Sequence, residues 1–342
     1  MATLIRRRGQ PESPGGGLYF TSPKTNLQFI HSGCALLDCV LGGGWPLGRV
    51  SNIVGDKSTG KTLLAIEACA NFLRKYQGDV LYVEAEAAFD PEYAAALGLP
   101  MQRIALVRDI GTVEEFFEAV GVFIGVDVAK GEEGDERKLR QKPGLIVLDS
   151  LDALSDKAES GRAIDEGSYG ATKARKLSEL FRRLVRPLEK TSTHTMIISQ
   201  VRDNIGVTFG RKHTRSGGRA LDFYASQILW LAHIQTLSNV VNKQKRATGV
   251  TIKAKLDKCK IGFPFRECEF DLRFGYGIED LEACVKFLDS LKKAGRVPAL
   301  KDLRRMRGTE LRQARELLGK VVAEEWYALE KQFAPTAGKY QE

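Results

Sequence analysis

The motif most able to do chemistry is a glycine-rich loop with the residue types and spacing of a P-loop, Gly55-Asp56-Lys57-Ser58-Thr59-Gly60-Lys61-Thr62. Its glycines let the backbone curl so that N–H groups and a helix N-terminus point at a nucleotide phosphate. Lys61 would then reach the β- and γ-phosphates, and the Thr62 hydroxyl would hold Mg²⁺. An apolar strand before the loop and a helix after it favour this interpretation over a chance glycine-rich turn.

Acidic residues at the ends of two expected strands could complete such a site. The aliphatic run Leu145–Asp149 ends in a carboxylate, so Asp149 is expected beside Mg²⁺ through a water molecule. Glu84 and Glu86 follow the run Val80–Val83, and residues two apart in a strand share a face, so both could approach one site. We predict that Glu86 is the catalytic base. Without the P-loop, two solvated carboxylates would be the simpler interpretation.

Short β-branched and aliphatic runs alternate with longer amphipathic stretches, which predicts an α/β fold with a mostly parallel central sheet flanked by helices over residues 28–277. After Gly277 only helical patterns remain, and they predict a small, basic α-helical domain over residues 278–342. Residues 1–27 are rich in Pro and Gly and predict a flexible arm. The expected strands are Arg49–Val54, Val80–Glu84, Leu145–Asp149, Thr195–Gln200, Ile228–His233 and Val250–Lys258, and the expected helices are Lys61–Tyr76, Thr112–Val128, Ala171–Lys190, Leu281–Lys293 and Thr309–Lys331.

Composition argues against several classes of protein. No stretch approaches the roughly 20 apolar residues of a membrane helix, and no secretory signal is evident, so we expect a cytoplasmic, nucleoid-associated protein, or one in the host cytoplasm if viral, with no membrane partner. The six cysteines lack a CxxC pair and indicate reduced, mostly buried thiols. A formal charge of +9 favours a polyanionic partner. Basic residues gather in Ala171–Lys190 and Lys292–Arg315, although a solvated helix face is the alternative for either window.

These motifs, in their order and separation, resemble the RecA family of DNA strand-exchange recombinases, from about Ser32 to Gly295. Leu41-Gly42-Gly43-Gly44 is similar to the family's approach to the P-loop strand, and Glu84–Tyr93 to its catalytic-glutamate segment. The resemblance implies a RecA-like P-loop ATPase core that binds ATP and Mg²⁺. It also implies that Glu86 is the hydrolytic glutamate and that Asp90 and Tyr93 flank the adenine.

The most specific part of the resemblance runs from Gln200 to Ser226. In the family, the glutamine at this strand end senses the γ-phosphate and the following loop is the second DNA-binding loop, so Gln200 is expected to couple nucleotide state to DNA contact. Ile205 resembles the apolar wedge that separates base triplets. Basic side chains here can also meet phosphates, and a glycine pair can expose N–H groups to them. The residues concerned are Arg202, Arg211, Lys212, Arg215, Gly217, Gly218 and Arg219.

An earlier segment, Glu159–Gly170, resembles the first DNA loop, where Tyr169 could stack on bases beside Gly170. The helix after it carries polar residues at spacings near 3, 4 and 7, which places them on one face. With one inserted residue they match DNA contacts of the family, while a plain amphipathic helix is the competing interpretation. These residues are Arg175, Ser178, Arg182 and Arg183.

The segment Lys258–Phe265 resembles the part of the family that reaches across the subunit interface to a neighbour's ATP. Ammonium groups of Lys258 and Lys260 beside a γ-phosphate would stabilise transition-state charge and make hydrolysis depend on assembly. An edge strand guarded by lysines is the alternative. Asp222 and Ile228 stand where many bacterial members carry Lys and Arg, so part of this interface is expected to differ.

Together these features predict an ATP- and Mg²⁺-dependent protein that assembles on single-stranded DNA and pairs it with homologous duplex DNA, with DNA-stimulated ATP hydrolysis. The expected homo-oligomer is a helical filament, although a ring stays open because residues 1–26 show no helix that could dock on a neighbour. Two alternatives remain at this point: a hexameric RecA-fold DNA helicase or motor, and an accessory DNA-binding regulator of the same fold without strand exchange.

Overall fold

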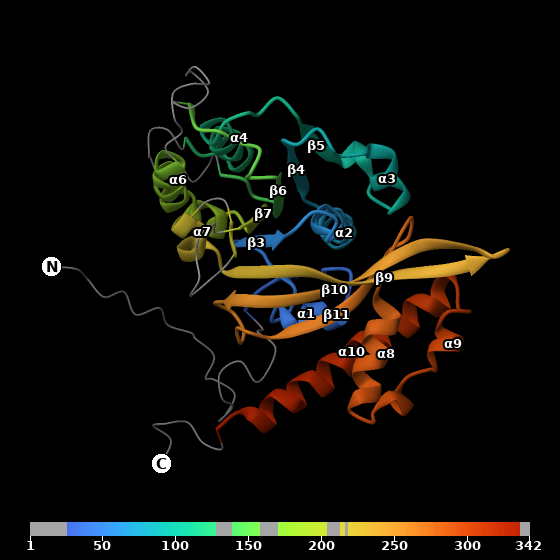
Figure 1. Cartoon of the computed structure of the whole chain (residues 1–342). Helices are drawn as coiled ribbons and strands as arrows, with labels where there is room; N and C mark the ends of the chain where they lie inside the picture. Colours follow the sequence, from blue (N-terminus) through green and yellow to red (C-terminus); the bar gives the residue numbers. More distant parts are fainter. Residues whose placement is uncertain (1–25, 128–138, 158–169, 204–212, 216–217, 336–342) are drawn as a thin grey trace, which may run out of the picture.

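The computed structural model describes residues 26–127, 139–157, 170–203, 213–215 and 218–335, so most of the predicted N-terminal arm lies outside it (Figure 1). Helices and strands are interleaved up to residue 224, four consecutive strands follow between residues 227 and 279, and the described residues after 279 hold only helices. In chain order the elements are β1 (Phe29–Ile30), α1 (Ala35–Val40), β2 (Trp45–Pro46), β3 (Val50–Gly55), α2 (Lys61–Lys75), β4 (Asp79–Glu84), α3 (Pro91–Ala96), the 3₁₀ turn η1 (Met101–Arg103), β5 (Ile104–Val107), α4 (Val113–Ile124), β6 (Gly144–Asp149), α6 (Gly170–Lys190), β7 (Thr193–Asp203), β8 (His213–Arg215), α7 (Gly218–Tyr224), β9 (Gln227–Val241), β10 (Gln244–Cys259), β11 (Glu267–Arg273), β12 (Gly277–Glu279), α8 (Asp280–Ser290), η2 (Ala294–Arg296), α9 (Leu300–Leu303) and α10 (Gly308–Phe333).

One mixed sheet organises the molecule. Its strands follow the order β12-β11-β10-β9-β3-β7-β6-β4-β5, and β8 pairs with β7. The strands from β5 to β9 along this order are parallel, whereas β9, β10, β11 and β12 pair antiparallel. This confirms the predicted α/β fold. It also brings the carboxyl ends of β3, β7, β6 and β4 together at one edge of the sheet.

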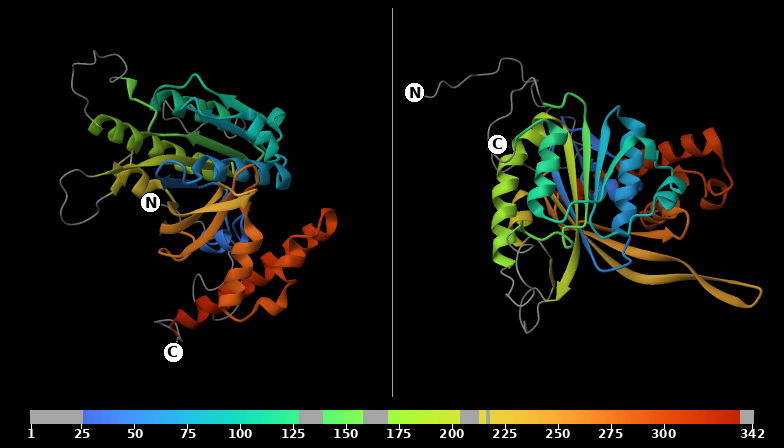
Figure 2. Two further views of the ribbon diagram at one scale, coloured as in Figure 1. Left: turned by 45° about the vertical axis from the view of Figure 1, so that its right-hand side comes forward. Right: turned by 90° about the horizontal axis from the view of Figure 1, so that it is seen from above.

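Helices cover both faces of the parallel strands (Figures 1 and 2). Val80 and Tyr82 of β4 belong to the buried cluster that contains α2, while Leu81 and Val83 belong to the cluster that contains α4 and α6. Successive strand residues point to opposite faces, and both faces here are buried. The strands are therefore continuous apolar runs, which is why they were readily predicted.

Several predicted boundaries shift for identifiable reasons. The helix expected over Thr112–Val128 begins with a capping box between Thr112 and Glu115 and ends at Ile124, because Gly125 adopts a left-handed conformation with φ of 81°. The strands expected over Ile228–His233 and Val250–Lys258 are the inner halves of a longer hairpin, β9–β10. Its outer halves are exposed and project beyond the helices, as Figure 2 shows.

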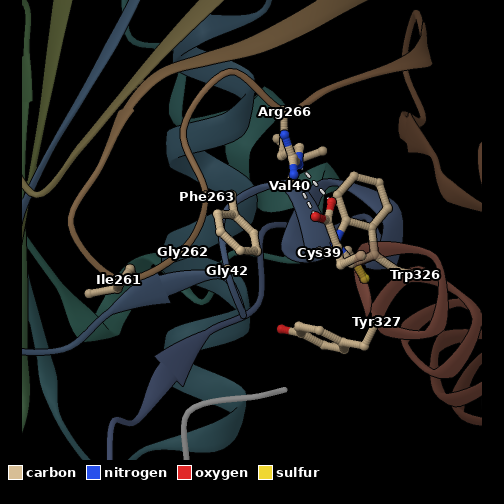
Figure 3. A pocket seen from close by; sticks show the side chains of 10 residues that line it. Cys39, Val40, Gly42, Ile261, Gly262, Phe263, Arg266, Trp326 and Tyr327 are labelled. Atoms are coloured by element: carbon tan, nitrogen blue, oxygen red, sulfur yellow. Dashed lines mark hydrogen bonds and ion pairs between the residues drawn. The ribbon is translucent and has the colours of Figure 1, made fainter. Parts of the chain in front are cut away.

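The C-terminal helices share the core of the preceding residues. Helices α8 and α10 pack on α1, and Leu288 and Trp326 belong to the same buried cluster as Ile30. A shallow hollow between α1, the 261–266 loop and α10 is closed by an ion pair in which Arg266 donates to both oxygens of Glu330, at 2.6 and 2.5 Å (Figure 3). A domain boundary at residue 278 stays a prediction.

Two compositional expectations can be compared with the structure. All six cysteines lie within the described residues, none forms a disulfide, and all but Cys259 are buried. In the portion of the chain that the structure describes, no helix is both long and apolar enough to cross a bilayer.

A buried histidine forms a hydrogen bond between the central sheet and β2. His194 of β7 is fully buried, and its Nδ1 lies 2.7 Å from the carbonyl oxygen of Pro46, so Nδ1 carries the proton and donates it. Its Nε2 has no partner among the described residues. Burial lowers the pKa of His194 to about 4, because the charged ring would lose its hydration.

Stability should therefore decline as the pH falls from about 6.5 to about 4. In that window the unfolded chain binds a proton that the folded ring refuses, so the free energy of unfolding decreases, by about 3 kcal/mol in total. Urea unfolding of the natural protein and of His194→Gln, at pH 7 and at pH 4.5, measures this. The variant should lose less stability between the two pH values, and equal losses in both proteins would contradict the assignment.

Candidate nucleotide and DNA site

The predicted P-loop joins β3 to α2 in a tight curl. The Thr59 hydroxyl donates to the carbonyl oxygen of Asp56 at 2.8 Å, and Lys61 Nζ donates to the same oxygen at 2.7 Å. Gly60 has a φ of 83°, and a Cβ atom there would lie 2.2 Å from Leu272 Cδ1, so the position requires glycine. The loop thus sets the helix N-terminus and the Lys61 ammonium group side by side, as phosphate binding requires.

The structure brings Thr62, near the start of α2, together with Asp149, at the end of β6. The hydroxyl groups of Thr62 and Tyr82 donate to Asp149 Oδ2 at 2.7 and 2.9 Å. Burial raises the pKa of Asp149, and these two hydrogen bonds oppose the shift. A hydroxyl and a carboxylate oxygen are ligands of the kind that Mg²⁺ prefers, so the pair fits the predicted cation.

The pKa of Lys61 depends on the same surroundings. Burial lowers the pKa of Lys61, while the carboxylates of Asp149 and Glu86 oppose that change. The acidic neighbours favour the charged form of the ammonium group. The phosphates of a polyanionic ligand would then replace the hydration that burial removes. The residues present therefore fit a nucleoside triphosphate with Mg²⁺.

The two glutamates after β4 have different surroundings. Glu84 is buried, with 3% of its surface exposed, and its Oε1 accepts the N–H groups of Glu86 and Ala88, both at 2.9 Å. Glu86 is exposed and accepts hydrogen bonds from Gln200 Nε2, at 2.8 Å, and from the Ser150 hydroxyl. The expectation that both glutamates share a strand face is wrong, because β4 ends at Glu84 and a turn carries Glu86 towards Gln200.

The two residues expected to flank adenine lie at the start of α3. The Asp90 carboxylate caps this helix by accepting the N–H groups of Glu92 and Tyr93, at 2.9 and 3.2 Å. Tyr93 is 37% exposed. Asp90 therefore has a structural role of its own, and contact with adenine stays a prediction for both residues.

Helix α6, which carries several of the predicted DNA contacts, has one polar face and one apolar face. Arg175 and Arg182 are exposed and Ser178 is half-buried, whereas Leu177 and Phe181 face the core. Arg183, predicted on the same polar face, forms an ion pair with Glu179 at 2.8 Å, and its contact with DNA stays a prediction. Of the remaining candidates, Gly170, Arg202, Arg215, Gly218 and Arg219 have only their backbone described, in α6, β7, β8 and α7, and Tyr169, Ile205, Arg211, Lys212 and Gly217 lie outside the described residues.

The two lysines expected to act on a neighbour are held by the end of α7. Lys260 Nζ donates to the carbonyl oxygen of Phe223 at 2.9 Å, and Lys258 Nζ donates to the carbonyls of Asp222 and Phe223. Lys258 pairs with Ile228, at the start of β9. Burial lowers the pKa of Lys260, and nearby Arg49 acts in the same direction.

These lysines and the P-loop lie at opposite edges of the sheet, beside the two ends of β3. Lys260 N–H donates to Ser226, whose own N–H donates to Val50 at the start of β3. The P-loop begins at the other end of β3, after Gly55. Five residue steps of strand separate Val50 from Gly55, which at a rise of about 3.3 Å per residue is about 17 Å. The lysines therefore cannot serve the nucleotide site of their own chain.

With this geometry in view, the comparison with known families is decisive. The RecA N-terminal domain family matches residues 18–279 of the chain. This protein belongs to the RecA family. The resemblance predicted from its motifs is thereby confirmed.

Individual relatives agree with the RecA assignment. The chain is 36% identical to Protein RecA of Prochlorococcus marinus (strain NATL1A) over 269 residues, which cover 78% of the chain and 65% of that relative. It is 37% identical to Protein RecA of Thermosynechococcus vestitus, over 79% of the chain and 69% of the relative. The crystal structure of the RadB recombinase matches 74% of the chain and 99% of its own with a TM-score of 0.51, and at 22% identity it supports the fold alone.

Three side chains of this RecA-family site were not predicted in their observed places. Tyr82 contacts Asp149, Ser150 contacts Glu86, and Glu84 shapes the turn that carries Glu86. A signal existed for all three. Tyr82 and Glu84 alternate on one face of β4, and Ser150 directly follows Asp149 at a strand end, where neighbouring strands of a parallel sheet converge.

Loss of the Glu84 carboxylate should impair catalysis more than binding. Glu84→Ala leaves two N–H groups without an acceptor, so the turn bearing Glu86 loses its shape and ATP turnover should fall roughly tenfold to a hundredfold. Glu84→Gln retains an oxygen for both donors and serves as the control. Turnover number and nucleotide affinity, measured for both variants, test this, and normal turnover in the alanine variant would refute the role.

Proposed function

We propose that this chain is an ATP- and Mg²⁺-dependent recombinase that assembles on single-stranded DNA, pairs it with a homologous duplex and hydrolyses ATP in response to DNA. ATP held between subunits stabilises the DNA-binding assembly, and hydrolysis releases it. Membership of the RecA family supports the class of activity. The chain's match spans 65% of the length of the Prochlorococcus relative, so the finer activity has to follow from this chain's own residues.

The observation that carries the proposal is the separation of the P-loop from Lys258 and Lys260. A cationic pair at the edge opposite Gly55 can reach a triphosphate only on another subunit. A head-to-tail contact of this kind repeats from copy to copy and builds a helix or a ring. The lysines would then stabilise charge in the transition state, as a finger in trans does.

Coupling between DNA binding and ATP hydrolysis is supported by the contacts at the two ends of the segment expected to bind DNA. Gln200 contacts Glu86 and is followed by the segment expected to bind DNA. That segment leads into α7, whose last carbonyls bind Lys258 and Lys260. A change at the DNA segment therefore has a direct route to the nucleotide site at one end and to the subunit contact at the other.

The basic C-terminal window contributes less free charge than its composition suggests. Arg296 pairs with Glu324 and Glu325, Arg304 with Glu282, and Arg315 with Asp280. We expect duplex DNA to be gathered by the exposed residues that remain. These are Lys292, Lys293, Lys301, Arg305, Arg307 and Arg312.

ATP hydrolysis with and without single-stranded DNA tests the proposal. The natural protein should show DNA-stimulated turnover, Lys61→Ala should abolish it by removing the phosphate contact, and Lys260→Ala should reduce it by roughly 10³-fold. Lys255→Ala, an exposed lysine of the same strand as Lys258, is the control and should behave normally.

Normal turnover in Lys260→Ala would exclude the role across the subunit interface. Electron microscopy of the natural protein with ATP and single-stranded DNA should show filaments. Rings without filaments would favour a hexameric motor instead.

A further inference from the structure

The turn that follows β6 contacts both the nucleotide site and the helix expected to bind DNA. β6 ends at Asp149, and residues 150–154 then pass between β7 and α6. The N–H group of Leu151 donates to the carbonyl oxygen of Ile198 at 3.0 Å, which anchors the turn to β7. Two charged side chains, Asp152 and Lys173, also bind at this turn.

Asp152 binds the backbone of Gln200. Its Oδ2 accepts the Gln200 N–H at 2.7 Å, a short bond to a charged acceptor. The same Gln200 donates from its side chain to Glu86 Oε1, and the Ser150 hydroxyl, two residues before Asp152, donates to that oxygen as well. The backbone of Gln200 is therefore held by Asp152. Its side chain is held by Glu86, which Ser150 of the same turn also contacts.

Lys173 binds the same turn from the side of α6. Its Nζ donates to the carbonyl oxygen of Leu151, at 2.8 Å, and to that of Leu154. Lys173 belongs to the helix that presents Arg175 and Arg182 to solvent. A shift of α6 would consequently move the carbonyl groups on either side of Asp152. The path from the helix surface to Gln200 consists of two charged side chains and one turn.

We infer that Asp152 and Lys173 are positioning residues that transmit DNA contact on α6 to the glutamine beside the nucleotide. This inference rests on the proposed function. When phosphates of single-stranded DNA engage Arg175 and Arg182, α6 moves, Lys173 moves the 150–154 turn, and Asp152 resets Gln200. The same linkage runs in reverse, because a coupling between two binding sites is reciprocal.

The test is the affinity for a slowly hydrolysed ATP analogue, measured with and without an oligothymidine strand. The ratio of the two dissociation constants is the coupling factor, expected within about 5- to 150-fold for the natural protein. Asp152→Ala should bring this factor to within about twofold of unity, because the Gln200 N–H loses its acceptor. Asp152→Asn should restore it, since the amide oxygen accepts the same N–H.

Lys173→Met is an independent second variant, and it should lose the coupling as Asp152→Ala does. Ala153→Ser, an exposed position in the same turn, is the matched control and should retain it. Thermal unfolding of each variant identifies any that fails to fold.

The outcomes separate the two hypotheses. If the strand does not change the nucleotide affinity of the natural protein, the proposed function is contradicted. A natural protein that couples, together with Asp152→Ala or Lys173→Met that couple equally well, overturns the inference alone. Failure of folded Asp152→Asn to restore the coupling would overturn it too, because the hydrogen bond would then not be the cause.

Discussion

Parallel strands end together, and the whole site depends on that constraint. Gly55 and Gln200 are register partners on β3 and β7, and Glu84 and Asp149 are partners on β4 and β6. The strand order places these ends next to one another, so residues far apart in the chain meet at one edge. Hydrogen bonds of 2.7 to 2.9 Å among the groups that follow these ends complete the arrangement.

The opposite edge of the same sheet carries the two interface lysines. There, α7 returns the chain from the expected DNA segment to the start of β9, and its terminal carbonyls hold Lys258 and Lys260. A strand is stiff and has a fixed rise per residue, so the distance between the two edges cannot be closed within one molecule. On this ground we propose that catalysis requires a neighbouring copy of the chain.

How much was predictable depended on how local each signal was. The P-loop, the Asp149 strand and the parallel sheet were predicted because adjacent residues encode them, as Gly60 and the run Leu145–Leu148 illustrate. The outer halves of β9 and β10 and the whole of β11 were missed, since their exposed or alternating residues lack a buried run. The role of Glu84 was also missed, because it depends on a turn. Asp152 and Lys173 gave no signal, because their partners lie on other elements.

The central claim is that each nucleotide is shared by two copies of the chain, and mixing two inactive variants measures it most directly. Lys61→Ala has a defective P-loop with intact interface lysines, and Lys260→Ala has the reverse. If the site is shared, a 1:1 mixture with single-stranded DNA should recover ATP hydrolysis at about a quarter of its seams, where the intact halves meet. A mixture no more active than the sum of its parts would contradict the account.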